Sequence, residues 1–221
     1  MAERLLTTEQ VRAFYDRFGR KQDWQGFYEG PALRALIAHA CFEQAEAVFE
    51  LGCGTGAFAA QLLGGILPSS ASYVGVDLSP TMVALARKRL TAFADRARVQ
   101  LSDGQLHFDV PAGAFDRFVA NYVLDLLAPQ DIVAVLAEAR RLLHPDGRLC
   151  LLSLTHGCTF LSRAVAGLWS RIHRRSPARV GGCRPLQLLD FIDTDEWRVD
   201  YQQVHVALGI PSQVVVATRS G

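Results

Sequence analysis

Short apolar runs alternate with amphipathic stretches along most of this chain. Runs typical of strands occur at residues 47–51, 72–77, 98–102, 115–122 and 147–154. Helical spacing of apolar residues predicts helices at 79–94 and 129–144, and two earlier ones at 7–20 and 31–40, joined by the irregular, aromatic-rich segment "DWQGFYEGP". Strands that alternate with helices predict a parallel sheet covered on both faces.

The C-terminal pattern is different. Residues 197–208 and 212–219 predict two strands joined by "GIP", a link too short for a crossover helix, so they must run antiparallel. The predicted fold is an α/β, doubly wound sheet of seven strands, mostly parallel, with one antiparallel strand in a C-terminal hairpin. We expect a single domain, divided into a helical cap (1–44), a ligand-binding core (45–155), an insertion (156–196) and the terminal hairpin (197–221).

Composition narrows the function classes. The 221 residues carry a formal net charge of +1, which favours neither nucleic acid nor a strongly anionic surface as partner. Five cysteines, an odd number without a C-x-x-C pair or metal-ligand spacing, indicate reduced thiols in a cytoplasmic protein without a bound metal. No signal-peptide pattern is present at the start, and no run approaches the ~18 apolar residues of a spanning helix.

The most informative segment is "AVFELGCGTGAFAAQLL", residues 47–63. Gly52, Gly54 and Gly56 follow a predicted strand and precede a predicted helix, where ligands of open α/β sheets bind. Asp77 ends the next strand, where a carboxylate can accept hydrogen bonds from both hydroxyls of a ribose. Glu50 is expected to lie under the loop, where its carboxylate would be close to a pyrophosphate bound at the loop. Because a carboxylate and a phosphate repel each other, Glu50 favours a ligand with no phosphate and with a cationic or ammonium-bearing group.

These residues match a known pattern. "FELGCGTG" followed by "VGVDLSPTMVALARKRL" resembles the first two motifs of class I S-adenosylmethionine-dependent methyltransferases, which have a Rossmann-like fold with a terminal antiparallel hairpin. The resemblance covers residues 45–155 best. It implies in-line transfer of a methyl group from S-adenosylmethionine to a small-molecule or lipid-like acceptor.

The resemblance also implies roles for individual residues. The three glycines bring the backbone close to the methionine moiety and ribose, Glu50 orients the loop or meets the amino group through water, and Asp77 binds the ribose. The remaining cofactor contacts are Leu78 and Met82 beside the adenine, Asp103 at its exocyclic amine with Gly104 and Gln105 next to it, and Asn121 on the methyl-transfer side.

Other interpretations stay open. The glycine turn can serve packing alone, Asp103 can form the turn in "SDG", and Asn121 can cap a helix. A non-catalytic ligand-binding or scaffold protein of the same fold is a second alternative, which the intact glycine loop and the ribose acid disfavour. A nicotinamide-dependent oxidoreductase fits less well, because neither of the two lysines, Lys21 and Lys88, follows a tyrosine by four positions. A nucleic-acid substrate is disfavoured, since "NYVLDLL" stands where base-methylating relatives have an Asn/Asp-Pro-Pro-aromatic sequence.

Two residues are candidates for catalysis. His156 follows the fifth predicted strand, and Tyr15 lies in the first helix, where an aromatic can close over the cofactor; each can equally be structural. His107 and Asp125 are held in reserve.

Residues 159–175 predict an amphipathic helix with a basic polar face. It is either a lid whose apolar stripe packs on the body or a membrane-surface helix. The second interpretation suits a lipid-like acceptor, and the layout is similar to quinone C-methyltransferases and bacterial phosphatidylethanolamine N-methyltransferases. Its apolar positions are Phe160, Leu161, Val165, Leu168, Trp169 and Ile172, and its basic ones are Arg163, Arg171, Arg174 and Arg175.

Overall fold

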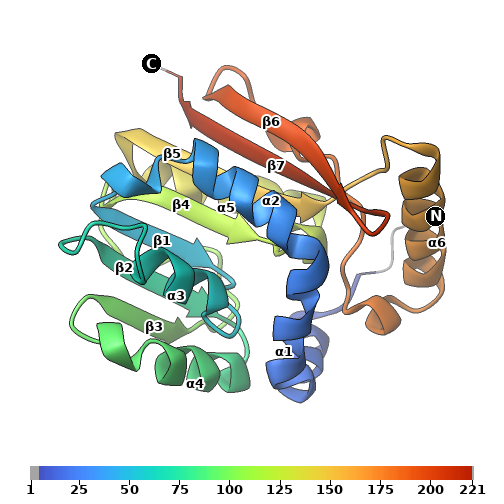
Figure 1. Cartoon of the computed structure of the whole chain (residues 1–221), viewed down its shortest axis with the longest axis horizontal. Coiled ribbons are helices and arrows are strands. Elements are labelled where there is room, and N and C mark those ends of the chain that lie inside the picture. The colour runs from blue at the N-terminus through green and yellow to red at the C-terminus, as the bar shows by residue number, and fades with distance from the viewer. Residues whose placement is uncertain (1–4, 221) are drawn as a thin grey trace.

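A computed structural model describes residues 5–220; residues 1–4 and 221, the ends of the predicted cap and hairpin, lie outside it. Seven strands of the described chain form one sheet in the order β3-β2-β1-β4-β5-β7-β6 (Figure 1). All neighbouring strands are parallel except at β7, which pairs antiparallel with β5 and β6. The predicted sheet is therefore confirmed. The strands are β1 Ala47–Leu51, β2 Ser72–Asp77, β3 Ala97–Leu101, β4 Phe115–Asn121, β5 Leu143–Leu154, β6 Trp197–Ala207 and β7 Ile210–Arg219.

Apolar side chains alternate between the two faces of the central strands, and each face has its own core. On one face Val48 and Val119 join the helices α2, α3 and α4, whereas Phe49 and Phe118 turn to the other face and pack against α5. This period of two is what a strand with both faces buried requires. The helices are α1 Thr8–Phe18, α2 Gly26–His39, α3 Ala57–Leu63, α4 Pro80–Arg89, α5 Pro129–Leu142 and α6 Phe160–Arg175.

The N-terminal connection differs from the prediction. "DWQGFYEGP" is not irregular, since a 3₁₀ helix spans Gly19–Gln25 and α2 already begins at Gly26, with Pro31 inside it. Glycine and proline within these residues gave the appearance of a loop, but Tyr28 and Ala32 are buried against the body, and this packing outweighs the low helix propensity.

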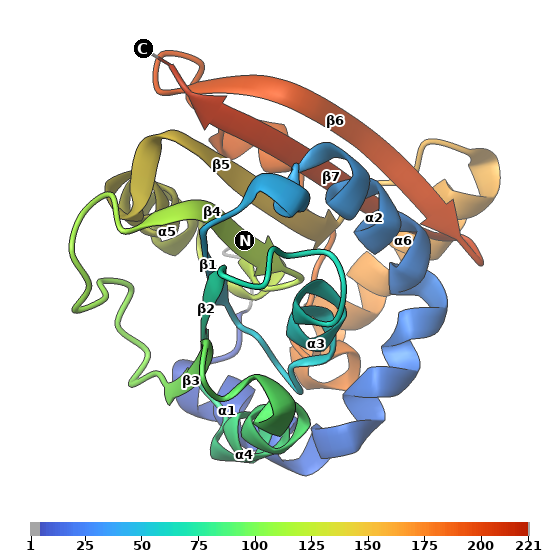
Figure 2. The same ribbon diagram turned by 60° about the vertical axis from the view of Figure 1, so that its left-hand side comes forward.

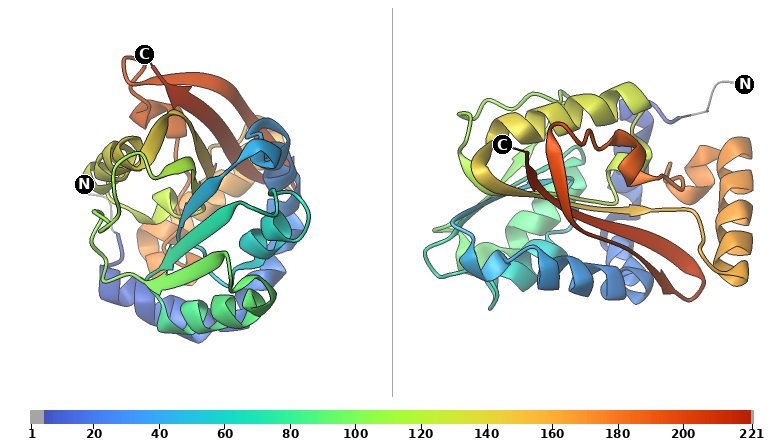
Figure 3. Two further views of the ribbon diagram at one scale, coloured as in Figure 1. Left: turned by 90° about the vertical axis from the view of Figure 1, so that its left-hand side faces the viewer. Right: turned by 90° about the horizontal axis from the view of Figure 1, so that it is seen from above.

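Two helices lie beyond the carboxyl ends of the parallel strands. Helix α1 contacts α4 across that edge of the sheet (Figure 2). Helix α6 lies at the side of the molecule, where it contacts β7, and one of its faces is turned outward (Figure 3). None of the described helices is long and apolar enough to span a bilayer.

Candidate active site

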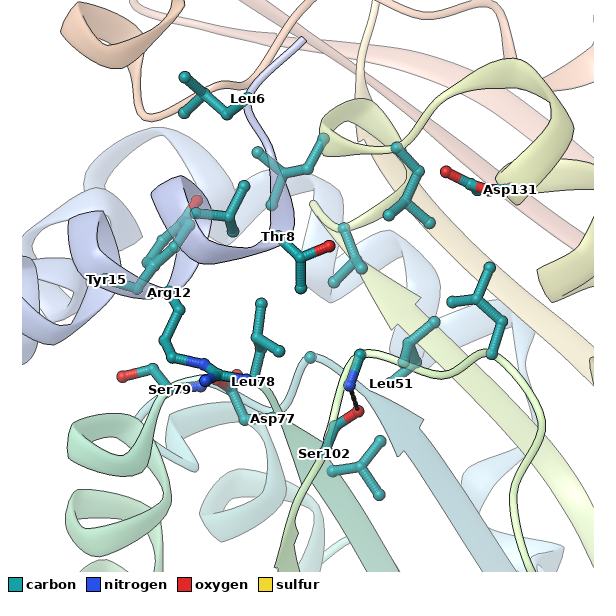
Figure 4. A pocket seen from close by; sticks show the side chains of 18 of the residues that line it. Leu6, Thr8, Arg12, Tyr15, Leu51, Asp77, Leu78, Ser79, Ser102 and Asp131 are labelled. Atoms are coloured by element: carbon teal, nitrogen blue, oxygen red, sulfur yellow. Dashed lines mark hydrogen bonds between the residues drawn. The ribbon is translucent and has the colours of Figure 1, made fainter.

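A cavity of about 410 Å³ opens at the carboxyl ends of β1, β2 and β4. Its floor includes Gly52, Asp77 and Asn121, and its roof is α1, which contributes Arg12 and Tyr15 (Figure 4). Most other lining side chains are apolar, among them Leu51, Val76, Leu78, Leu126 and Leu127. The cavity lies where the glycine-rich turn and the acid after β2 meet, as the sequence predicts.

The glycine-rich turn is built for two different purposes. Gly52 lines the cavity with φ +69°, and a Cβ there would collide with the side chain of Val123. Gly56 instead caps α3 with φ +74°, and a Cβ at Gly56 would lie 3.1 Å from the backbone of Ala86 on α4. The first glycine thus keeps the cavity open, whereas the third allows two helices to approach each other. Gly54 and Gly56 are not part of the cavity lining.

Asp77 ties the two motif segments together. Its carboxylate accepts a hydrogen bond from Gly54 N at 2.8 Å and another from Ser79 N at 2.9 Å. Burial raises the pKa of Asp77, and these backbone donors work in the opposite direction. The side chain is therefore held in place at the edge of the cavity.

Glu50 is a buried carboxyl beneath the turn, 2% exposed. The Tyr73 hydroxyl donates a hydrogen bond to its Oε2, and Asn121 Nδ2 donates to Oε1 at 3.4 Å. Burial raises the pKa of Glu50 to about 7 despite these donors. A cation in the cavity would favour the ionised form.

Three buried polar atoms of cavity residues lack a hydrogen-bond partner among the described residues. They are Arg12 Nε, Gln22 Oε1 and Asn121 Oδ1. Buried polar groups are nearly always paired in native proteins. One donor and two acceptors without partners therefore fit a polar ligand that carries both donors and acceptors. An amino acid joined to a nucleoside, as in S-adenosylmethionine, has both.

The roof of the cavity is attached by two acidic side chains. Asp16 of α1 accepts hydrogen bonds from Ser79 Oγ and from Thr81 N at the start of α4. Asp23, in the following 3₁₀ helix, accepts from Thr55 Oγ1 at 2.6 Å and forms an ion pair with Arg89 at 2.6 Å. The cap is thus anchored to both predicted cofactor-binding segments.

The other predicted cofactor residues divide into two groups. Leu78, Gly104 and Gln105 line the cavity. Met82 is fully buried, and it is absent from the lining. Asp103 is exposed, also lies outside the lining, and accepts a hydrogen bond from Gln105 N at 2.9 Å, which is the turn that "SDG" suggested.

Of the two catalytic candidates, only Tyr15 lies at the cavity. His156 is exposed and lies outside the lining. Tyr15 lines the cavity, with its hydroxyl 3.7 Å from Cys183 Sγ, and burial raises its pKa. His107 lies away from the cavity and pairs with Glu138 at 3.0 Å.

Asp125 has the environment of a proton acceptor. It is fully buried and not itself part of the cavity lining, but the next residue, Leu126, lines the cavity. Leu154 N donates to its Oδ2 at 3.4 Å, and Oδ1 has no hydrogen-bond partner in the described chain. Burial raises the pKa of Asp125 to about 7, in spite of the nearby Arg184 guanidinium. Tyr122, three residues before Asp125, has φ +53°, a strained backbone conformation that is common at functional sites.

Several cavity residues were not identified from the sequence. Arg12 and Gln22 belong to the cap, and Ser102 Oγ accepts a hydrogen bond from Gly104 N at 3.0 Å at the cavity edge. The only local signal was the Thr7–Gln10 pair, which forms a capping box at the start of α1. It marks the start of a helix but not what the helix covers.

Comparison with known proteins agrees with this geometry. The family model described as a methyltransferase domain matches residues 48–147. Residues 48–147 thus match a methyltransferase domain, in agreement with the resemblance of the glycine-rich turn and the acid after β2 to class I S-adenosylmethionine-dependent methyltransferases.

Curated proteins that are similar to this chain differ in their named activities. Carboxy-S-adenosyl-L-methionine synthase of Chromohalobacter salexigens is 36% identical over 143 residues, which are 64% of this chain and 51% of that protein. Demethylmenaquinone methyltransferase of Tropheryma whipplei is 31% identical over 117 residues, 53% of this chain and 45% of that protein. The chain thus spans about half the length of these curated relatives.

The fold is shared over a longer stretch. Geranyl diphosphate C-methyltransferase of Streptomyces coelicolor, solved with Mg²⁺, geranyl diphosphate and S-adenosyl-L-homocysteine, superposes with a TM-score of 0.72 and covers 100% of both chains at 12% identity. At that identity the likeness shows the fold alone. It includes the cap and the terminal hairpin of this chain.

Proposed function

We propose that this protein transfers a methyl group from S-adenosylmethionine to a small-molecule, lipid-like acceptor. The observation that carries the proposal is the cavity at the carboxyl edge of the sheet, where Asp77 and three unpartnered polar atoms line the site and the buried Glu50 lies beneath it. When bound, S-adenosylmethionine supplies an activated methyl group on a sulfonium. The chain therefore needs to hold the cofactor, exclude water and orient the acceptor.

Individual roles follow from these positions. Asp77 takes the ribose hydroxyls, and Gly52 lets the backbone approach the ligand. Gln22 Oε1 and Asn121 Oδ1 accept hydrogen bonds from the ligand's ammonium group, whose charge is balanced by Glu50. Leu78, Gly104 and Gln105 surround the base.

The acceptor binds on the side of Tyr15 and Tyr122, away from Asp77. Where the acceptor must lose a proton, Asp125 receives it, since the carboxyl is buried next to the cavity with a free oxygen and a pKa of about 7. His156, the histidine favoured by the sequence, is exposed and outside the cavity lining, so it has no part in the proposal.

Isothermal titration tests the cofactor. S-adenosylmethionine and S-adenosylhomocysteine are titrated into the purified protein, with NAD and NADP as controls on the same preparation. Binding of the first pair alone supports the proposal, and binding of NAD or NADP contradicts it. A screen with methyl-labelled cofactor against quinols, phenols, amines and aminophospholipids then tests transfer. Binding without transfer to any acceptor would favour a non-catalytic S-adenosylmethionine-binding protein.

A further inference from the structure

Helix α6 leaves large apolar side chains uncovered. Its inward face is packed, with Ala166 and His173 buried and Trp169 Nε1 donating to Cys183 O at 2.9 Å. The apolar stripe predicted from the sequence is split, because part of it points to solvent. The exposed side chains are Phe160 at 91%, Leu161 at 63% and Leu168 at 60%. Three large exposed apolar side chains on one helix are a reason to look for a partner that covers them.

The C-terminal half of the same helix borders a basic groove of about 280 Å³. Arg171, Arg175 and Arg179 line it together with Leu168 and Ile172. None of these three guanidinium groups has a hydrogen bond or ion pair with another residue in the described chain. Residues 147–189 contain seven arginines and no aspartate or glutamate, so no acidic side chain from this stretch offsets the charge.

The apolar and basic positions share one side of the helix. At 3.6 residues per turn, Phe160, Leu161, Leu168, Arg171 and Arg175 fall within about 100° of the circumference. Apolar side chains therefore occupy the first half of this face and arginines the second.

The turn between β6 and β7 extends the apolar half. Leu208, in this turn, is 78% exposed. A Cβ added at the neighbouring Gly209 would lie 3.1 Å from Val165 Cγ2 and 3.6 Å from Leu161 Cγ, so the turn packs against the first half of α6. We define the outward α6 face as Phe160, Leu161, Leu168, Arg171, Arg175, Arg179 and Leu208.

We propose that the outward α6 face docks on an anionic phospholipid bilayer, with its arginines on lipid phosphates and its apolar side chains in the interface. Charge complementarity selects this occupant, because a second copy would bring two arginine clusters together. Bulky apolar side chains next to arginines on one helix face are typical of helices that lie in a membrane interface. The inference does not depend on methyl transfer.

Vesicle sedimentation tests the proposal with the full chain. Vesicles of phosphatidylcholine alone are compared with vesicles that also contain phosphatidylglycerol, at low and high salt. We expect pelleting with the anionic vesicles only, weakened at high salt because the arginine–phosphate attraction is screened. No pelleting with either vesicle, or equal pelleting with both, would overturn the proposal. So would pelleting without vesicles, which would indicate self-association.

Matched variants locate the surface. Arg171→Gln with Arg175→Gln should weaken vesicle binding by about tenfold or more, since each basic side chain near an anionic surface contributes to binding. Leu161→Gln with Leu168→Gln should weaken it as well, by removing apolar burial.

The control has the same loss of charge. Lys88→Gln with Arg98→Gln lies on α4 and the edge strand β3, at the opposite edge of the sheet from β6, and should bind like the unmodified protein. An equal loss in this control would mean that net charge acts rather than a defined surface, and would overturn the proposal. Repeating the sedimentation with millimolar inorganic phosphate separates docking on a bilayer from a site for free phosphate. If the arginines form a free-phosphate site, the added phosphate saturates it and vesicle binding is lost, which would overturn the proposal. If the face docks on a bilayer, the apolar side chains still contribute and vesicle binding is retained. Far-UV circular dichroism checks that every variant is folded.

Discussion

Replacing Glu50 with glutamine should stabilise the ligand-free protein at alkaline pH. The side chain is 2% exposed, and its pKa is raised from 4.5 to about 7, chiefly by burial. Because the native carboxyl binds its proton more tightly than the unfolded one, its contribution to stability is fully present below pH 4.5 and is lost as the pH rises through 7. At pH 8 the native protein carries a buried carboxylate that glutamine would not introduce.

The magnitude follows from the size of the shift. A displacement of about 2.5 pKa units corresponds to about 3 kcal/mol at about 1.4 kcal/mol per unit, which is an upper bound for the gain at pH 8. The new amide oxygen can still accept from the Tyr73 hydroxyl. Its NH₂ group can donate to Asn121 Oδ1, which has no partner in the unmodified protein, once the Asn121 amide turns over. The Glu50→Gln change therefore removes a charge and keeps the number of unpaired buried groups unchanged, since the turned Asn121 leaves its NH₂ group unpaired in place of Oδ1.

Urea unfolding of the ligand-free protein at pH 5 and pH 8 measures this effect. The Glu50→Gln protein should exceed the unmodified protein in free energy of unfolding at pH 8, and the advantage should shrink at pH 5. Affinity for S-adenosylmethionine should fall about tenfold, because the charge opposite the ammonium is lost.

Glu138→Gln is the matched control. Hydrogen bonds from Arg141 and Phe108 N outweigh the burial of Glu138 and lower its pKa to about 2. Its stabilising contribution is present above pH 4.5 and is lost only as the pH falls through 2, so Glu138→Gln should destabilise the protein at both test pH values. If the Glu50→Gln difference were the same at pH 5 and pH 8, the charged-burial argument would be refuted.

Four further substitutions test the site. Gly52→Ala should lower the melting temperature more than Gly113→Ala, since both positions have φ +69° but only the Cβ at Gly52 meets a side chain; equal shifts would leave backbone strain as the whole effect. Asp77→Ala should weaken S-adenosylmethionine binding at least about tenfold by calorimetry, and unchanged affinity would place the ribose elsewhere. With an acceptor that must lose a proton, Asp125→Asn should lower kcat by about 10²-fold or more, and cofactor affinity should stay unchanged. The substitution should also remove the ionisation near pH 7 from the pH profile of kcat. An unaltered profile would exclude Asp125 as the base. Asp23→Asn should release the cofactor about tenfold faster in stopped-flow experiments, because the cap loses its ion pair, and an unchanged rate would mean that the cap does not hold the ligand.

The sequence alone predicted those features of the fold and the site that depend on residues close together in the chain. Short apolar runs that alternate with helical patterns predicted the sheet. A turn residue directly after a strand must lie at the carboxyl edge of the sheet, so Gly52 and Asp77 were expected at the cavity, where both lie. The same local logic also placed Asp103 beside the cofactor, but in the structure Asp103 lies outside the cavity lining. Its carboxylate is used within its own turn, and the neighbours Ser102 and Gly104 reach the cavity in its place.

What the sequence could not give depends on contacts between distant segments. Whether the apolar stripe of α6 was a lid or a surface depended on how much of the stripe the body could cover. Trp169 finds the carbonyl of Cys183, whereas nothing in the described chain covers Phe160. The same holds for the cap, where Asp23 meets Arg89 across 66 positions of the chain. Apolar periodicity in the sequence shows that one face of a helix is apolar, but not which part of the protein, or which partner, covers that face.

The attachment of the cap explains how a ligand can enter a roofed cavity. Helix α1 buries none of its residues fully, so little apolar burial holds it closed. The polar contacts that attach the cap include the hydrogen bonds of Asp16 on α1, the hydrogen bonds and ion pair of Asp23 in the following 3₁₀ helix, and the contact of Tyr15 with Cys183. Each net hydrogen bond contributes only about 1 kcal/mol. Opening of such a segment costs far less than global unfolding. Because both acids anchor on the segments that carry Gly54 and Ser79, the backbone donors to Asp77, closure of the cap and correct placement of the ribose acid are coupled. Cofactor binding should therefore protect the amides of α1 from hydrogen exchange more than those of the sheet, and equal protection in both would show that the cap is rigid without ligand.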